Sequence, residues 1–301
     1  MFDKPSLAST YLPKLEEWWQ MLLTSPWLFV ILLPLTIVLM RRHGVLAYGS
    51  YRSTVIGLLL ATLYIGGQAM WGLLPVHIGL VGLLLIIVLS DEVVSSLSHG
   101  RSPFFVYDMG LQLGLLLMIH PGVLLLYPFF IAKLKSIESG TIRHISALIA
   151  GSATVLLLFT MLFAHRSWEG ITAYWSSWAI PLTSYRVPHW EVVLISVLLL
   201  LFLLVCSVAL WLRMRSSTVR VRNAITYHLQ LSWLLMALQL LFGLQNRFLL
   251  VYVLGVLFLC GTMVDYLITQ KHFRWVLIPL SIILIASLVL TAQVQGHLSL
   301  F

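Results

Sequence analysis

Long apolar runs follow one another along most of this chain, separated by charges or prolines. Charged residues make up 9% of the 301 residues, against about a quarter in soluble domains, and charge this sparse cannot cover a water-facing globule. The runs are continuous rather than alternating, which excludes a membrane β-barrel. We therefore expect an all-α, polytopic helical membrane protein. Its candidate spans are residues 26–40, 53–74, 76–90, 104–119, 121–133, 144–164, 191–212, 224–243, 248–268 and 275–294.

About ten transmembrane helices are expected, with eight as the lower bound, because several runs are shorter than the roughly 20 residues that cross a bilayer. Cytoplasmic loops carry the excess of Lys and Arg. With both termini outside, thirteen of the eighteen Lys and Arg residues fall in inner segments and five in outer segments. This predicts a multi-pass protein of the bacterial cytoplasmic (inner) membrane. Its net charge of +8 then reflects orientation and contact with membrane lipids, and no nucleic acid partner is expected.

Two regions differ from the spans. Residues 1–25 predict an amphipathic helix lying in the membrane interface, because their leucines and tryptophans fall near one helical face. Residues 26–301 predict a single transmembrane domain with an aromatic outer loop at 166–190. The first twenty residues lack the apolar core of a signal peptide, so we expect the first span to direct insertion.

Ionisable groups inside apolar runs are costly in lipid, so each is a functional candidate. No such group lies near the middle of a predicted span, which argues against an ion- or proton-coupled transporter. The structural alternatives are a solvated cytoplasmic turn for Asp91 and Glu92, capping or ion pairing for Asp108 and Asp265, and hydrogen bonds between helices for His228. The inner-leaflet candidates are Asp91, Glu92, Asp108, Gln112, His228 and Asp265.

A second group of candidates belongs to the predicted outer face. Aromatic rings settle at the headgroup level, so the simpler interpretation of the outer loop is an aromatic belt. The alternative is a platform for a lipid-linked or glycan ligand, with the cations at a phosphate. The outer-face candidates are His120, Arg166, Glu169, Trp175, Trp178, Arg186 and His189.

The two cysteines, Cys206 and Cys260, lie inside apolar runs and are expected to behave as small hydrophobes. No metal site is predicted. No catalytic residue can be assigned, because none of the familiar catalytic sequence motifs is present. No cofactor is expected beyond a polyprenyl-phosphate lipid or a bound phospholipid.

The apolar run from Tyr107 to Leu134 covers 28 residues, about 42 Å as one helix, which is too long for a single span. We expect a tight outer turn at His120-Pro121 between two short antiparallel helices. Proline suits the first turn of a helix, and the residue before it is biased away from helical geometry. Pro128 is expected to kink the second helix.

The first helix of this hairpin has two faces of interest. Gly110 and Gly114 lie four residues apart, which predicts close approach of a neighbouring helix. Asp108 and Gln112 share another face, where they are expected to line a polar cavity near the inner surface or to serve as a cap and ion pair.

Residues 102–163 resemble the membrane core of GT-C-class polyprenyl-phosphate-sugar glycosyltransferases. The resemblance lies in the Gly-Leu pairs at 110–111 and 114–115 and in Ile119-His120-Pro121, where His120 stands at the basic position of the family's turn. The chain is also similar to uncharacterised multi-spanning proteins of Bacteroidota. The resemblance implies a role in cell-envelope biogenesis by handling polyprenyl-linked glycan. No catalytic acid carries over, so the chain is either an active transferase or a catalytically degenerate relative.

Two other functions stay open. The short loops and the many small residues within spans fit a non-catalytic structural or assembly subunit of a larger inner-membrane complex, with other inner-membrane or envelope proteins as partners. A transporter is the second alternative.

Overall fold

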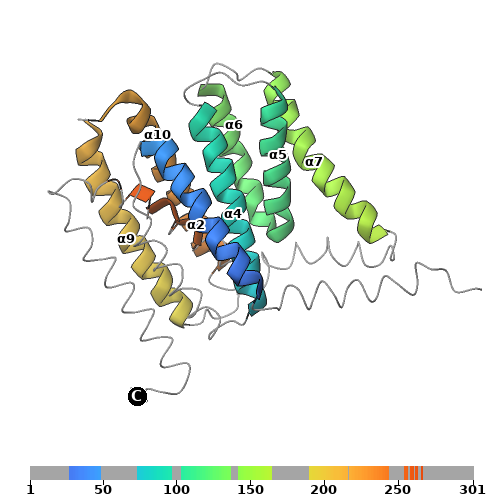
Figure 1. The fold of residues 1–301 in the computed structure, drawn as a ribbon, viewed down its shortest axis with the longest axis horizontal. Coiled ribbons are helices and arrows are strands. Elements are labelled where there is room, and N and C mark those ends of the chain that lie inside the picture. The colour runs from blue at the N-terminus through green and yellow to red at the C-terminus, as the bar shows by residue number, and fades with distance from the viewer. Residues whose placement is uncertain are drawn as a thin grey trace, which may run out of the picture.

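The computed structural model describes residues 27–48, 73–96, 103–136, 142–164, 190–215 and 217–243, and short pieces between 254 and 266. Every regular element in these ranges is helical, which confirms the all-α prediction for the described part of the chain. The elements are α2 (Trp27–Tyr48), α4 (Leu73–Ser96), α5 (Pro103–Ile119), the 3-10 helix η1 (Pro121–Leu125), α6 (Leu126–Ser136), α7 (Ile142–Ala164), α9 (Trp190–Met214), α10 (Val219–Leu238) and the π-helix η3 (Gln239–Gly243) (Figure 1).

Four segments of these helices are long and apolar enough to cross a membrane: Ile31–Tyr48, Ile142–Met161, Ser196–Met214 and Val219–Leu241. Large apolar side chains stand exposed along them, many with more than half of their surface accessible. Contiguous apolar surface of this kind is rare on proteins that face water and matches a hydrocarbon solvent. The chain is a helical membrane protein.

Two helices run further than the apolar runs indicate. The predicted span 26–40 ends before Arg41, but α2 continues to Tyr48. The predicted span 76–90 ends before Asp91, but α4 continues to Ser96. The prediction that Asp91 and Glu92 occupy a cytoplasmic loop is therefore wrong. A charge does not end a helix when a neighbouring helix supplies its partner, and Asp91 has partners in α2.

Several predicted features lie outside the described residues. They are the interfacial helix at 1–25, the span at 53–74 apart from its last two residues, most of the span at 248–268, the span at 275–294, and the aromatic loop apart from Trp190.

Small residues hold α5 against α7, its most extensive neighbour. A Cβ added at Gly110 would overlap the backbone carbonyl of Leu148, and one at Gly114 would lie 3.0 Å from Cα of Ser152. The Ser152 hydroxyl donates a hydrogen bond of 2.9 Å to the carbonyl of Gly110. The predicted close approach is confirmed. Gly151 of α7 in turn faces the backbone of α5, so these glycines pack inside the chain and offer no seat to a partner helix.

The turn between α5 and α6 forms where the sequence predicts it. His120 has extended backbone geometry, with φ −156° and ψ 132°, and Pro121 opens η1. The amide of Gly122 donates a hydrogen bond of 3.0 Å to Nδ1 of His120. The kink at Pro128 stays a prediction; α6 begins at Leu126, directly after η1. Pro128 therefore lies in the first turn of a helix, where an N–H has no intrahelical acceptor to lose.

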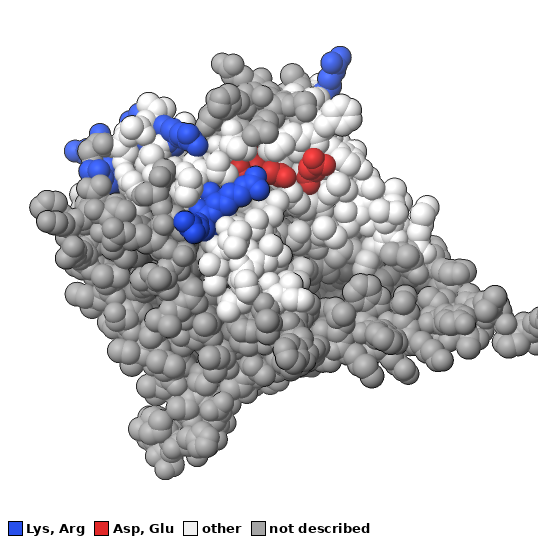
Figure 2. All heavy atoms as spheres, viewed as in Figure 1, with Lys and Arg blue, Asp and Glu red and all other residues white. Residues whose placement is uncertain are grey.

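The described cations gather at one end of the helices, seen in the upper part of Figure 2. At this end α2, α6 and α9 finish and α7 and α10 begin, and we call it the basic end. Arg220 of α10 ties two of these helices together by donating a hydrogen bond of 2.7 Å to the carbonyl of Leu46 in α2. The described Lys and Arg side chains there are Arg41, Arg42, Lys133, Arg143, Arg213, Arg215, Arg220 and Arg222.

Candidate functional site

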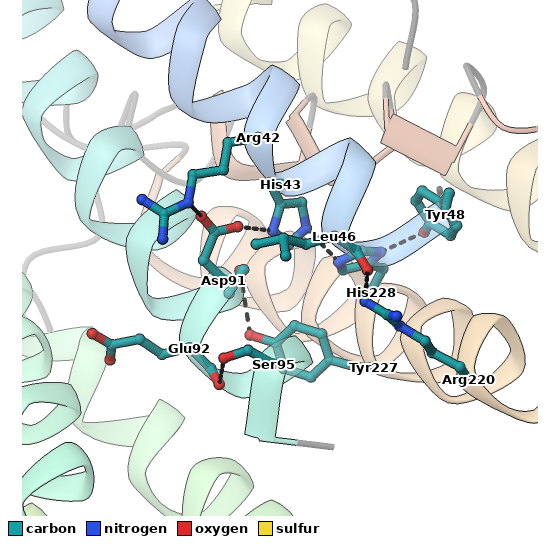
Figure 3. Close-up of polar contacts among 11 residues, drawn as sticks. Arg42, His43, Leu46, Tyr48, Asp91, Glu92, Ser95, Arg220, Tyr227 and His228 are labelled. Carbon is teal, nitrogen blue, oxygen red and sulfur yellow. Dashed lines mark hydrogen bonds and ion pairs between the residues drawn. The ribbon is translucent and has the colours of Figure 1, made fainter. Parts of the chain in front are cut away.

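Four polar side chains from three helices form a continuous series of hydrogen bonds near the basic end (Figure 3). Nδ1 of His43 lies 2.5 Å from Oδ1 of Asp91, and Nε2 of His43 lies 2.8 Å from Nε2 of His228. Nδ1 of His228 lies 2.5 Å from the Tyr48 hydroxyl. We call these four residues the His–Asp chain. None of them exposes more than 7% of its surface, so the series is enclosed by protein.

The hydrogens of the His–Asp chain can be placed by elimination. With Asp91 ionised and both rings neutral, Asp91 only accepts, so Nδ1 of His43 must donate to it. Nε2 of His43 is then an acceptor, and Nε2 of His228 donates to it. Nδ1 of His228 is left to accept from the Tyr48 hydroxyl. Every donor therefore points towards Asp91, which is the arrangement that lets a proton pass along the series.

Aromatic rings surround the two histidines. The Phe258 ring lies 5.2 Å from that of His43, and Tyr266 stacks on Tyr48 at 5.0 Å between centroids. Tyr227 packs beside His228 at 5.4 Å and donates a hydrogen bond of 3.3 Å to the Ser90 hydroxyl. This wall shields the rings from water, so a proton that moves between them moves along the hydrogen bonds of the series.

Arg42 balances the charge at the Asp91 end. Its Nε lies 3.7 Å from Oδ2 of Asp91, and 69% of its side chain is exposed. Asp91 needs such partners because it lies in the last two turns of α4, where the helix dipole disfavours an anion. A buried carboxylate is tolerated when it is paired and hydrogen-bonded. The series therefore ends at a cation that reaches the surface of the basic end.

The other acidic candidates are placed apart from this series. Gln112 of α5 donates a hydrogen bond of 2.7 Å to Oε1 of Glu92, which joins α5 to α4. Asp108 is exposed on α5, one turn before Gln112. The partner of Gln112 is therefore Glu92. Among the described residues, Gln112 and Asp108 do not line a common polar cavity.

Three polar residues, which are His228 and Ser232 of α10 and Gln239 at the start of η3, are buried, and two of them join neighbouring helices. His228 binds α2, and Ser232 donates to the carbonyl of His228 at 2.7 Å. Gln239 donates a hydrogen bond of 3.4 Å to Ser196 of α9. His120, by contrast, lies buried in its turn with 4% exposure. The remaining candidates, which are Arg166, Glu169, Trp175, Trp178, Arg186, His189 and Asp265, lie outside the described residues.

Sequence reasoning missed His43 and Tyr48, half of the series. The predicted first span ends at residue 40, before the Arg41-Arg42 pair. Arginines at a helix end extend their charged heads to the interface while the helix continues. The available signal was the apolar stretch that resumes after His43 and reaches Tyr48.

No group of three or more His, Cys, Asp and Glu residues in the described ranges is arranged to hold a metal ion. Both nitrogens of His43 and both of His228 already have hydrogen-bonding partners. Cys206 and Cys260 are buried and free. The described chemistry is therefore that of proton exchange between fixed side chains.

The His120 turn gives a pH dependence that can be measured. Burial lowers the pKa of His120 from 6.5 to about 4, and the ring accepts the Gly122 amide in its neutral form. This stabilisation is complete above pH 6.5 and is lost as the pH falls from 6.5 towards 4, by up to about 3 kcal/mol. His120→Asn keeps an acceptor at the turn but does not titrate. We expect the unfolding temperature of the variant to fall less than that of the wild type between pH 6.5 and 4. Equal falls in the two proteins would contradict this role of His120.

Comparison with known proteins assigns no family: no family model, curated protein or solved structure matches the chain. The GT-C resemblance therefore stays a prediction, and the function has to be argued from the geometry of the His–Asp chain.

Proposed function

We propose that the chain is a proton transporter of the bacterial cytoplasmic membrane and that the His–Asp chain is its proton-transfer element. The observation that supports this is the unbroken series of hydrogen bonds from Tyr48 to Asp91 across three helices. Two of these helices, α2 and α10, are long and apolar enough to cross a membrane. Buried ionisable groups in membrane helices are expensive and mark proton relays and solute paths. Apolar side chains of the same size would pack these helices without that cost.

The series can move one proton with all bonds balanced. A proton reaching the Tyr48 hydroxyl lets the existing hydroxyl proton pass to Nδ1 of His228. The Nε2 proton of His228 passes to Nε2 of His43, and the Nδ1 proton of His43 passes to Asp91. Asp91 ends neutral, both rings end in the opposite tautomer, and neither ring carries a net charge. The Arg42 side chain contacts Asp91 and is 69% exposed, so the proton leaves the series at this surface.

A proton relay fits the geometry better than a hydrolytic or transfer site. Each ring nitrogen is already engaged by another member of the series, at 2.5 to 2.8 Å. A catalytic base needs one such atom directed at a substrate. The proposal includes the topology expected from the sequence, with about ten spans and both termini outside. The glycan-handling hypothesis depends mainly on outer-loop residues that lie outside the described ranges. The complex-subunit hypothesis depends on small residues, and the glycines among them in α5 and α7 pack against each other. Both stay predictions.

Proton flux into liposomes tests this function. The purified protein would be reconstituted with a pH-sensitive dye inside, and an acid jump applied outside with potassium and valinomycin present to balance charge. We expect the wild type to acidify the interior well above protein-free liposomes. In His228→Gln the amide can still form hydrogen bonds, but it cannot accept a proton on one atom while releasing one from another. The flux should therefore fall by about a hundredfold, the lower end of what a positioned proton-transfer group contributes.

His144→Gln is the matched control, since His144 is also buried but belongs to α7, which supplies no member of the series. It should keep the wild-type rate. Wild-type flux equal to that of empty liposomes, or equal flux in wild type and His228→Gln, would refute the proposal.

A further inference from the structure

A groove of about 640 Å³ lies between α6 and α10. Its walls are mainly apolar, and they include Phe129 of α6 and Trp233 of α10. The two helices run in opposite directions here. Lys133 and Gln230 therefore line the part of the groove nearer the basic end, while Leu125 and Ala237 line the opposite part.

The groove has the chemistry of an amphiphile. Lys133 supplies a positive charge and Gln230 an amide at one end, and the rest is hydrocarbon. From Gln230 to Ala237 the groove follows α10 for about 10 Å by helical rise, the length of the first part of an acyl chain. The described cations gather at the same end as Lys133, where the headgroups of a bilayer would lie if these helices cross it.

One aromatic layer separates the groove from the His–Asp chain. The Lys133 ammonium lies 5.6 Å from the centre of the Phe129 ring. The other neighbour of Phe129 is Tyr227, which stacks on it at 5.9 Å with an interplanar angle of 27°. Tyr227 is the residue before His228 and binds Ser90, the residue before Asp91. An occupant of the groove therefore touches the wall that encloses the buried series.

We propose that this groove binds an acidic phospholipid of the surrounding bilayer, with its phosphate at Lys133 and Gln230 and one acyl chain along Phe129 and Trp233. A zwitterionic lipid has the same acyl chain but no net charge to match the lysine. The site rests on the groove and its lysine, and it does not depend on proton transfer by the His–Asp chain.

Trp233 supplies the measurement, because it lines the groove and is exposed. The protein would be reconstituted in vesicles containing either brominated phosphatidylglycerol or brominated phosphatidylcholine, whose bromine atoms quench nearby tryptophans. The chain has 11 tryptophans, so the signal of Trp233→Phe is subtracted from that of the wild type. We expect the acidic lipid to quench the Trp233 signal at about fivefold lower mole fraction, the preference that one lysine gives near a membrane surface.

Lys133→Gln should remove this preference. Arg222→Gln, which changes an exposed cation of α10 that does not line the groove, should leave it intact. Equal quenching by the two lipids in the wild type would show an ordinary lipid contact and overturn the proposal. So would a Trp233 signal that neither lipid quenches, which means that a protein segment covers the groove.

Discussion

His43→Phe is expected to lower the free energy of unfolding by about 3 kcal/mol, the cost of leaving a buried charged group without its hydrogen-bond donor. The phenyl ring fills the space of the imidazole, so packing changes little. The Asp91 carboxylate, however, loses its 2.5 Å donor and keeps only the longer contact with Arg42. His228 loses its partner at 2.8 Å in the same step. Denaturant or thermal unfolding in a mild detergent measures the loss.

A second variant separates the stranded charge from general damage. In His43→Phe/Asp91→Asn the carboxylate is replaced by a neutral amide of the same shape, so the double variant should be more stable than His43→Phe alone. Asp108→Asn is the matched control, because Asp108 is exposed and its change should cost little. A double variant no more stable than His43→Phe would show that Asp91 is not stabilised by His43.

Gly110→Ala is expected to cost about 2 to 3 kcal/mol, at the upper end for overpacking of a close contact. The added methyl group meets the backbone of α7 at Leu148 and Gly151. Backbone cannot rotate away, so the two helices must separate and the Ser152 hydrogen bond to Gly110 must lengthen. Thermal unfolding, with size-exclusion chromatography to detect aggregation, checks this.

Gly255→Ala is the matched control for that experiment. Its added methyl group meets the δ1 methyl groups of Leu235 and Ile86, at 2.8 and 3.0 Å. These are the ends of flexible side chains, which can change rotamer at small cost. We therefore expect a loss well below that of Gly110→Ala. Equal losses in the two variants would contradict the view that backbone contact sets the spacing of α5 and α7.

The features predicted correctly are those that depend on neighbours in sequence. The helical membrane class follows from the apolar runs, and the His120-Pro121 turn follows from the geometry of proline. The close contact at Gly110 follows from a four-residue repeat on one helix. Each of these needs only a few consecutive residues, and each is present in the structure.

The His–Asp chain could not be predicted in the same way. His43 and Asp91 are 48 residues apart, and His43 and His228 are 185 apart. Asp91 looks like a loop residue until α2 is known to supply its partners. The argument against a proton-coupled transporter considered only ionisable groups within the predicted spans. It left out the pair of His43 and Asp91, because the predicted spans end before these residues while α2 and α4 continue past them. Helix ends at charged residues are set by tertiary pairing, which a single sequence does not show.

The 185-residue separation also orders the events of biosynthesis. A growing chain delivers α2 and α4 to the membrane before α10 has been made, so His43 can bind Asp91 early but Nε2 of His43 must wait for His228. Until α10 arrives, the polar end of α2 has no complete set of partners in lipid, where unsatisfied groups are expensive. The contact between His43 and His228 that closes the buried series can therefore form only after α10 has been inserted.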